Sequence, residues 1–90
     1  MHGFYEWNPA KAAENLAKHR ISMRAAQRFE WDSALERIDA RNAYGEVRCM
    51  ALGLIGARLH VLVFTRRGLK IRVISLRNAN IREVKFYAEF

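Results

Sequence analysis

The chain has 90 residues, of which 51% are hydrophobic and 28% are charged, and its formal net charge is +7 at pH 7. This composition excludes a disordered basic tail, and the length predicts a single domain over residues 1–90 with one core. A single Cys49 excludes an internal disulfide and suggests a buried thiol. The N-terminus lacks the basic and apolar pattern of a leader, and no segment approaches the roughly 18 apolar residues of a membrane span. We therefore expect a cytoplasmic protein.

Two helices are predicted in the N-terminal third. Asn8-Pro9 marks the start of the first, because Asn caps free backbone N–H groups and proline at the first helical position loses no hydrogen bond. This helix should end at about His19. Ser22 can cap a second, shorter helix. Its buried face is indicated by three apolar residues at helical spacing, Met23, Ala26 and Phe29.

The next part of the chain has the patterns of strands and turns. Alternation over residues 34–40 suits an edge strand, and Asn42–Gly45 is a turn. Three β-rich runs follow, Val47–Ile55, Arg58–Thr65 and Lys70–Leu76. The links Gly56-Ala57 and Arg66-Arg67-Gly68 are short enough for hairpins, so these strands should be antiparallel neighbours.

A short helix is predicted to close the chain. Asn80 and Glu83 have the spacing of a capping box, and the residues after Asn80 place apolar side chains on one helical face. The expected architecture is α+β, with two N-terminal helices, an antiparallel sheet of about four strands and a short C-terminal helix. Helices should cover one face of the sheet and leave the other open.

The basic excess lies in the C-terminal half. Residues 47–90 hold nine basic and two acidic residues, whereas residues 1–46 hold seven of each. A small sheet with this charge attracts phosphates, so nucleic acid is the first partner to consider and an anionic membrane surface is the second. An open, arginine-lined face would be a groove for RNA. Its expected RNA-binding residues are Arg48, Arg66, Lys70 and Arg82.

Arginine would also suit catalysis on a bound RNA, should the chain cleave it without a metal. The ribose 2′-OH then attacks the adjacent phosphate, which requires a proton acceptor, a group at the leaving oxygen and cations for the charge on the phosphorane. The candidate cations are Arg67, Arg72 and Arg77, because a guanidinium meets two phosphate oxygens at once. Arg72 and Arg77 would face opposite sides of a regular strand, so we expect Arg77 to lie past the strand end.

Proton transfer has fewer candidates. His19 is the first, since the ordinary pKa of histidine is about 6.5, and Lys18 is the second. Both also suit a structural role as cations at a helix C-terminus. Tyr87 could stack on a base or shield the leaving group, with core packing as the alternative. Glu83 is better explained as the capping-box partner of Asn80 than as a base.

No metal or cofactor is expected. The three histidines are far apart in the sequence, Cys49 is alone, and no pair of His or Cys residues has the spacing of zinc ligands. No Gly-rich loop precedes a helix, which leaves nucleotide-cofactor binding without support.

The chain also carries short motifs in a distinctive order. The opening motif is Phe4-Tyr5-Glu6-Trp7-Asn8-Pro9-Ala10-Lys11-Ala12, followed by Asn15, Lys18-His19 and Ile21-Ser22-Met23. Later come Asp39, Glu46, Arg48, Leu52-Gly53, Val63-Phe64-Thr65, Arg67, Ile71-Arg72-Val73-Ile74-Ser75, Arg77 and Glu83. Together, and over nearly the whole chain, these motifs resemble the BrnT family of bacterial toxins.

The resemblance implies a RelE-like fold and a metal-independent ribonuclease that arrests growth by cleaving RNA. It also implies a toxin of a type II toxin–antitoxin system with a cognate ribbon-helix-helix antitoxin encoded beside it. That antitoxin would mask the toxin in a hetero-oligomer and bind operator DNA.

The chain departs from the family pattern in three places. Arg20 stands where Gly is common, and a non-Gly residue in left-handed backbone costs on the order of 1 kcal/mol or changes the exit from the helix. Leu76 replaces a small residue, and Asn78-Ala79-Asn80 replaces a more basic segment that ends in Thr. The alternative function is therefore a non-catalytic basic module that binds RNA or a partner protein.

Overall fold

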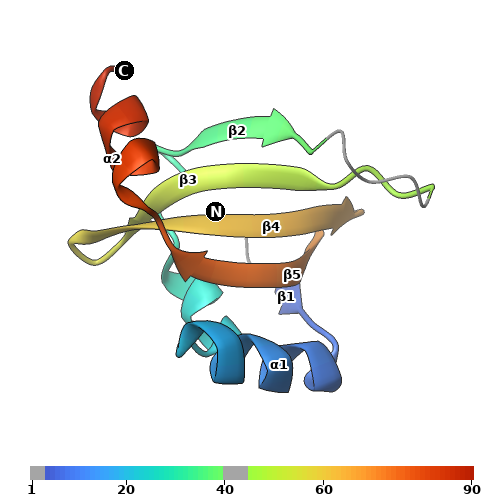
Figure 1. The fold of residues 1–90 in the computed structure, drawn as a ribbon. Helices are drawn as coiled ribbons and strands as arrows, with labels where there is room; N and C mark the ends of the chain where they lie inside the picture. Colours follow the sequence, from blue (N-terminus) through green and yellow to red (C-terminus); the bar gives the residue numbers. More distant parts are fainter. Residues whose placement is uncertain (1–3, 40–44) are drawn as a thin grey trace.

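The computed structural model describes residues 4–39 and 45–90. Within these residues a five-stranded sheet is accompanied by two α-helices and one 3₁₀ helix (Figure 1). In chain order the elements are β1 (Phe4–Glu6), α1 (Pro9–His19), the 3₁₀ helix η1 (Met23–Arg28), β2 (Leu35–Ile38), β3 (Cys49–Ile55), β4 (Arg58–Arg67), β5 (Lys70–Asn78) and α2 (Ile81–Ala88).

The α+β class is confirmed, but the sheet differs from the predicted one at one edge. The strand order is β1-β5-β4-β3-β2, and β1 is parallel to β5 whereas the other neighbours are antiparallel. The prediction of an antiparallel sheet of about four strands is therefore wrong, because it lacks β1. Three residues are too few to show an alternation, and the partner of Phe4 is the distant Lys70.

The predicted caps of the N-terminal helices are confirmed. Asn8 Oδ1 accepts hydrogen bonds from two backbone N–H groups, at 2.8 and 3.2 Å, and α1 ends at His19. Ser22 caps the next segment with its hydroxyl, but that segment is a 3₁₀ helix. The three-residue spacing of Met23, Ala26 and Phe29 matches the three-residue turn of such a helix, so these side chains lie on one face.

The core lies between η1 and one face of the sheet. Its buried residues are Met23, Ala26, Phe29, Ala51, Leu62, Phe64, Ile71, Val73 and Leu76. The buried face predicted for the second helix is thus confirmed. Gly53 lies directly under Phe29, since a Cβ at Gly53 would be 2.3 Å from Phe29 Cζ. This contact leaves no room for a side chain at Gly53.

Asn15 of α1 continues the sheet edge beyond β1. Its Oδ1 accepts a hydrogen bond from the Leu76 N–H at 3.0 Å, and its Nδ2 donates to the Leu76 carbonyl at 2.8 Å. The Asn15 side chain is buried, and its amide takes the place of a neighbouring strand. α1 accordingly lies along β5 (Figure 1).

A bulge interrupts β5. Val63 of β4 pairs with Ser75, and the next residue, Phe64, pairs with Val73. Ile74 is therefore the extra residue, and the alternation of side chains changes phase at this point.

Three strand ends differ from the predicted ones. β3 begins at Cys49, which is half-buried rather than buried. β4 continues to Arg67, so the hairpin turn consists of Gly68-Leu69. β5 continues to Asn78, and the expectation that Arg77 lies past the strand end is wrong. The predicted turn at Asn42–Gly45 falls mostly outside the described residues.

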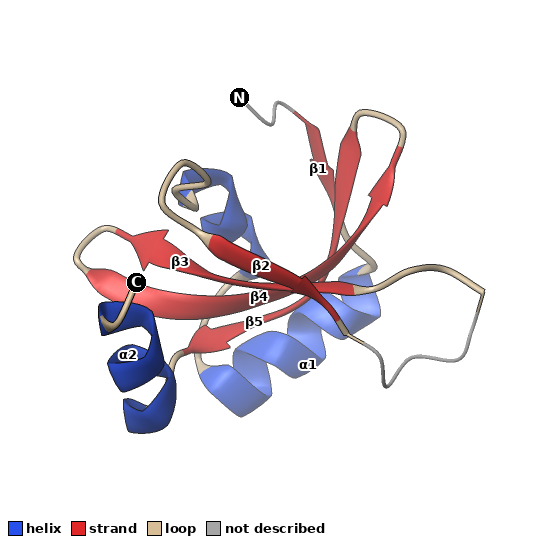
Figure 2. Ribbon diagram, turned by 90° about the horizontal axis from the view of Figure 1, so that it is seen from above, coloured by secondary structure: helices blue, strands red, loops and turns tan. Residues whose placement is uncertain are grey.

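α2 and η1 lie on opposite faces of the sheet (Figure 2), so the prediction that helices cover one face and leave the other open is wrong at the end of the sheet where α2 packs. The predicted capping box is present, because Asn80 Oδ1 accepts from the Glu83 N–H and Glu83 Oε1 accepts from the Asn80 N–H. The Tyr87 hydroxyl donates to the Ser33 carbonyl at 2.8 Å and ties α2 to the segment before β2. In the described part of the chain, every helix is too short or too polar to cross a membrane.

Candidate functional site

The bulge brings Arg72 and Arg77 to the same face of the sheet. Arg72 pairs with Thr65 and Arg77 pairs with Val61, and these two β4 residues are four positions apart. Residues four apart on a regular strand share a face. This is the face opposite η1, and we call it the open face. The two arginines are about 13 Å apart along it, the length of four strand residues, so they cannot grip one phosphate together.

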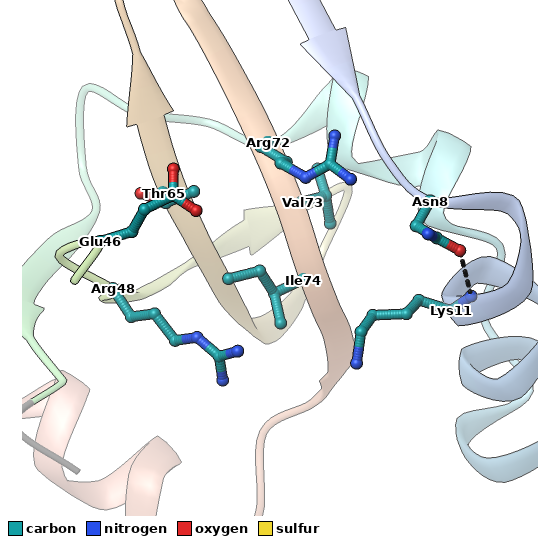
Figure 3. A pocket seen from close by; sticks show the side chains of 8 residues that line it. All are labelled: Asn8, Lys11, Glu46, Arg48, Thr65, Arg72, Val73 and Ile74. Carbon is teal, nitrogen blue, oxygen red and sulfur yellow. Dashed lines mark hydrogen bonds between the residues drawn. The ribbon is translucent and has the colours of Figure 1, made fainter. Parts of the chain in front are cut away.

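A pocket of about 140 Å³ lies on the open face beside β5. Its lining residues are Asn8, Lys11, Glu46, Arg48, Thr65, Arg72, Val73 and Ile74 (Figure 3). Three of them are cations from separate parts of the chain: Lys11 from α1, Arg48 from the segment before β3 and Arg72 from β5. Lys11 and Arg48 extend toward each other across Ile74 (Figure 3).

Glu6 orients the cations at the β1 end of the pocket. The parallel pairing sets Glu6 beside Arg72, and its Oε2 accepts a hydrogen bond from Arg72 Nη1 at 3.1 Å. The same carboxylate lies 3.7 Å from Lys70 Nζ and 3.9 Å from Arg67 Nη1. The Arg72 side chain remains 30% exposed, so a ligand can still reach its guanidinium.

Glu46 and Arg67 form a two-point ion pair at the pocket rim. Arg67 Nε donates to Glu46 Oε2 at 2.8 Å, and Arg67 Nη2 donates to Oε1 at 2.9 Å. These hydrogen bonds, and the positive charges of Arg67, Arg72 and Arg48, lower the pKa of Glu46. The same pair raises the pKa of Arg67. Glu46 is thus a carboxylate at neutral pH.

Neither Lys11 nor Arg48 forms an ion pair among residues 4–39 and 45–90, although Arg48 is near enough to help lower the pKa of Glu46. The backbone next to Arg48 is held by Thr65, whose hydroxyl donates to the Val47 carbonyl at 2.9 Å. Cations that form no ion pair and line an accessible pocket can bind an anion with several oxygens, such as a phosphate of a nucleic acid. The pocket can therefore neutralise charge on a phosphate.

His19 lies at the other end of α1 from this pocket. Eight residues of helix separate it from Lys11, which is about 12 Å. Burial, then Lys18, then Arg77 lower the pKa of His19 below its ordinary value of 6.5. Arg77 itself donates to both carboxylate oxygens of Glu83, at 2.9 and 2.8 Å. Lys18, His19 and Arg77 thus form a second basic region, which the structure does not join to the pocket.

Three further predicted residues lie apart from the pocket. Arg66 faces the η1 side, where it pairs with Glu36 at 2.9 Å and lies 5.0 Å from the ring centroid of Phe64. Arg82 is on α2 and lines a different cavity. The Tyr87 hydroxyl is engaged by Ser33, as described above.

Two residues of the pocket, Lys11 and Glu46, and Glu6 beside it received no role from the sequence. Lys11 and Glu6 are brought to it by α1 and β1, and only the pairing of β1 with β5 sets Glu6 beside Arg72. Glu6, Lys11 and Glu46 all belong to the quoted motifs, which were the available signal. Across residues 4–39 and 45–90, His, Cys, Asp and Glu side chains form no group of three that could hold a metal ion.

Comparison with known proteins identifies the family of this chain. None of the curated proteins compared with this chain matches it. The family model described as the ribonuclease toxin BrnT of type II toxin–antitoxin systems matches residues 7–83, which include the whole of α1 and β5 and every residue that lines the pocket. The chain therefore belongs to the BrnT family of ribonuclease toxins.

Proposed function

We propose that this toxin is a metal-independent endoribonuclease and that the scissile phosphate of its RNA binds in the pocket of Lys11, Arg48 and Arg72. The observation that carries the proposal is the convergence of these three cations in one pocket, two of which form no ion pair in the described residues. RNA would lie across the open face, with its flanking nucleotides near Lys70 and Arg77.

Each cation has a distinct task in this proposal. Arg72, held by Glu6, presents its guanidinium to the phosphate oxygens, and Lys11 and Arg48 neutralise the charge that develops on the phosphorane. The ribose 2′-OH loses its proton to Glu46 and attacks the phosphorus, the bond to the 5′ oxygen breaks, and that oxygen takes a proton from solvent water. The products are a 2′,3′-cyclic phosphate and a 5′-hydroxyl. No metal is required for these steps.

Glu46 is the group that we assign to the 2′-OH proton, because it is ionised and lines the pocket. Arg67 fixes the orientation of that carboxylate. His19, Lys18 and Arg77 are too far from the pocket to serve the same phosphate, so we assign them to a neighbouring nucleotide. Tyr87 is assigned to anchoring α2 rather than to chemistry.

The neutralising partner in this proposal is a ribbon-helix-helix antitoxin whose complex with the toxin binds operator DNA. Membership of a type II family implies an antitoxin partner. The fold of the antitoxin rests on the motif resemblance, and a shift of operator DNA by the purified complex, absent with toxin alone, would support it.

The test is induced expression in a bacterium with growth and total RNA as readouts. Wild type should arrest growth and degrade RNA, whereas Arg48→Ala and Lys11→Ala should slow cleavage by purified protein roughly 100-fold. Cleavage by wild type should persist in EDTA. The matched control is Arg58→Ala, an exposed arginine of β4 on the η1 side, which should cleave like wild type.

Two results would contradict the proposal. Full cleavage by both pocket variants would place the chemistry elsewhere. RNA binding by wild type with no cleavage product would favour the non-catalytic basic module instead.

A further inference from the structure

We propose that the groove between α2 and the β2–β3 edge of the sheet binds an acidic amphipathic segment of the antitoxin. The inference rests on the proposed function for the identity of the partner. It names a second surface, distinct from the phosphate pocket, and the residues that make it.

The groove has an apolar floor. Its volume is about 580 Å³, and its lining is Ala34, Leu35, Glu36, Arg37, Met50, Leu52, Arg82, Glu83, Phe86 and Phe90. Phe86 is 51% exposed and Phe90 is 78% exposed. Arg82 and Phe86 are one helical turn apart on α2, and Phe90, just past the end of the helix, continues their stripe along the groove. A stripe of this kind, left uncovered, marks a protein-binding surface.

The charges at the rim select an acidic partner. Glu36 is already paired with Arg66 at 2.9 Å, and Glu83 is held by Arg77 at 2.8 Å. In contrast, neither Arg37 nor Arg82 forms an ion pair within the described residues, although the charge of Arg37 contributes to the lowered pKa of Glu83. The groove therefore offers two guanidinium groups to an incoming segment and no free carboxylate, so charge complementarity requires Asp or Glu beside its apolar side chains.

A peptide segment fits this floor better than RNA does. Leu35, Met50 and Leu52 provide an aliphatic surface that suits apolar side chains rather than bases. The rings of Phe86 and Phe90 pack against each other with centroids 4.9 Å apart, which uses part of the aromatic surface on which bases would stack. The pocket around Arg72 remains the site for phosphates.

Occupation of the groove would also control the open face. Arg37 and Met50 form a cross-strand pair on the same side of the sheet as Arg72 and Arg77. Glu83 both lines the groove and holds Arg77, so the groove borders the path that we assign to RNA. A segment seated there would block that path without entering the pocket.

The test separates neutralisation from toxicity. Phe90→Ser changes no charge and lies outside the proposed RNA site, so this variant should arrest growth like wild type. Coexpressed antitoxin, taken as the product of the adjacent small open reading frame, should fail to relieve that arrest. Arg37→Glu borders the proposed RNA path and is therefore read only in the binding titration below. In a titration of purified antitoxin into toxin carrying Arg72→Ala, each added substitution should weaken binding roughly tenfold or more. Lys85→Glu, a charge reversal outside the groove lining, is the matched control and should bind normally.

The outcomes distinguish this inference from the function on which it rests. Unchanged antitoxin affinity in both groove variants would overturn the inference, even if wild type is a ribonuclease. Loss of RNA cleavage with full antitoxin affinity would assign the groove to RNA. A dimer of toxin alone, dispersed by Phe90→Ser in sedimentation, would assign it to a second copy. Failure of wild type to arrest growth would contradict the proposed function only, because the titration measures antitoxin binding and does not depend on toxicity.

Discussion

At the scale of single residues, Arg20 is the strained position. Its backbone is left-handed, with φ 60° and ψ 29°, and it is the only non-glycine residue with positive φ among residues 4–39 and 45–90. Its N–H still donates to the Leu16 carbonyl at 2.9 Å, so the helix ends as a glycine would end it. Arg20 in place of the common Gly therefore leaves the exit from α1 unchanged and lowers the stability of the fold.

We predict that Arg20→Gly is more stable than Arg20→Ala by about 1 kcal/mol. Both variants remove the same charge, so the comparison isolates the cost of a Cβ in left-handed backbone. The measurement is the free energy of unfolding from urea denaturation. Equal stability of the two variants would mean that the backbone at this position is not left-handed in solution.

His19 gives a prediction about pH. Because burial, Lys18 and Arg77 lower its pKa in the folded chain, the unfolded chain binds this proton more tightly. The contribution of neutral His19 to stability is therefore complete above the unfolded value of about 6.5 and is lost as the pH falls through the lowered pKa. Lys18→Ala and Arg77→Ala should both raise the pKa of His19, Lys18→Ala by more. An NMR titration of the imidazole measures this, and an unchanged pKa in both variants would show that these cations do not act on it.

At the scale of elements, the edge of β5 depends on a single side chain. Asn15 makes hydrogen bonds to the Leu76 N–H and carbonyl and to the Ile21 carbonyl at 3.0 Å. Asn15→Ala would leave these backbone groups without partners in a buried site, and we predict a loss of roughly 3 kcal/mol of stability. Asn8→Ala removes an exposed cap and should cost only about 1 kcal/mol. Thermal and urea unfolding compare the two, and an equal cost would argue against the edge role of Asn15.

The sequence predicted those helix ends that are fixed by contacts between residues close together in the chain. The caps at Asn8, Ser22 and Asn80 bond to groups within three residues, so their signal is contained in a short window. β1 and the Asn15 contact were not predictable in this way, because their partners are in β5. The bulge at Ile74 was also not predictable, because a β-rich run is expected to alternate its side chains regularly between the two faces of the sheet.

At the scale of the whole molecule, the basic C-terminal half does not act as one surface. The sheet divides it, with Arg66 on the η1 side and Arg72 and Arg77 on the open face. The pocket takes its third cation, Lys11, from the half of the chain that is neutral overall. Charge counting identified the class of partner, but the assignment of residues to one site required the topology of the sheet.

The parallel pairing of β1 with β5 also sets the time at which the pocket can form in a newly synthesised chain. Glu6 and Arg72, which meet in the folded protein, are 66 residues apart. Synthesis at about 5–20 residues per second separates them by roughly 3–13 s. Lys11 and Arg72 cannot share a pocket before then, so a nascent toxin lacks the site that we propose for phosphate until most of its length has been translated.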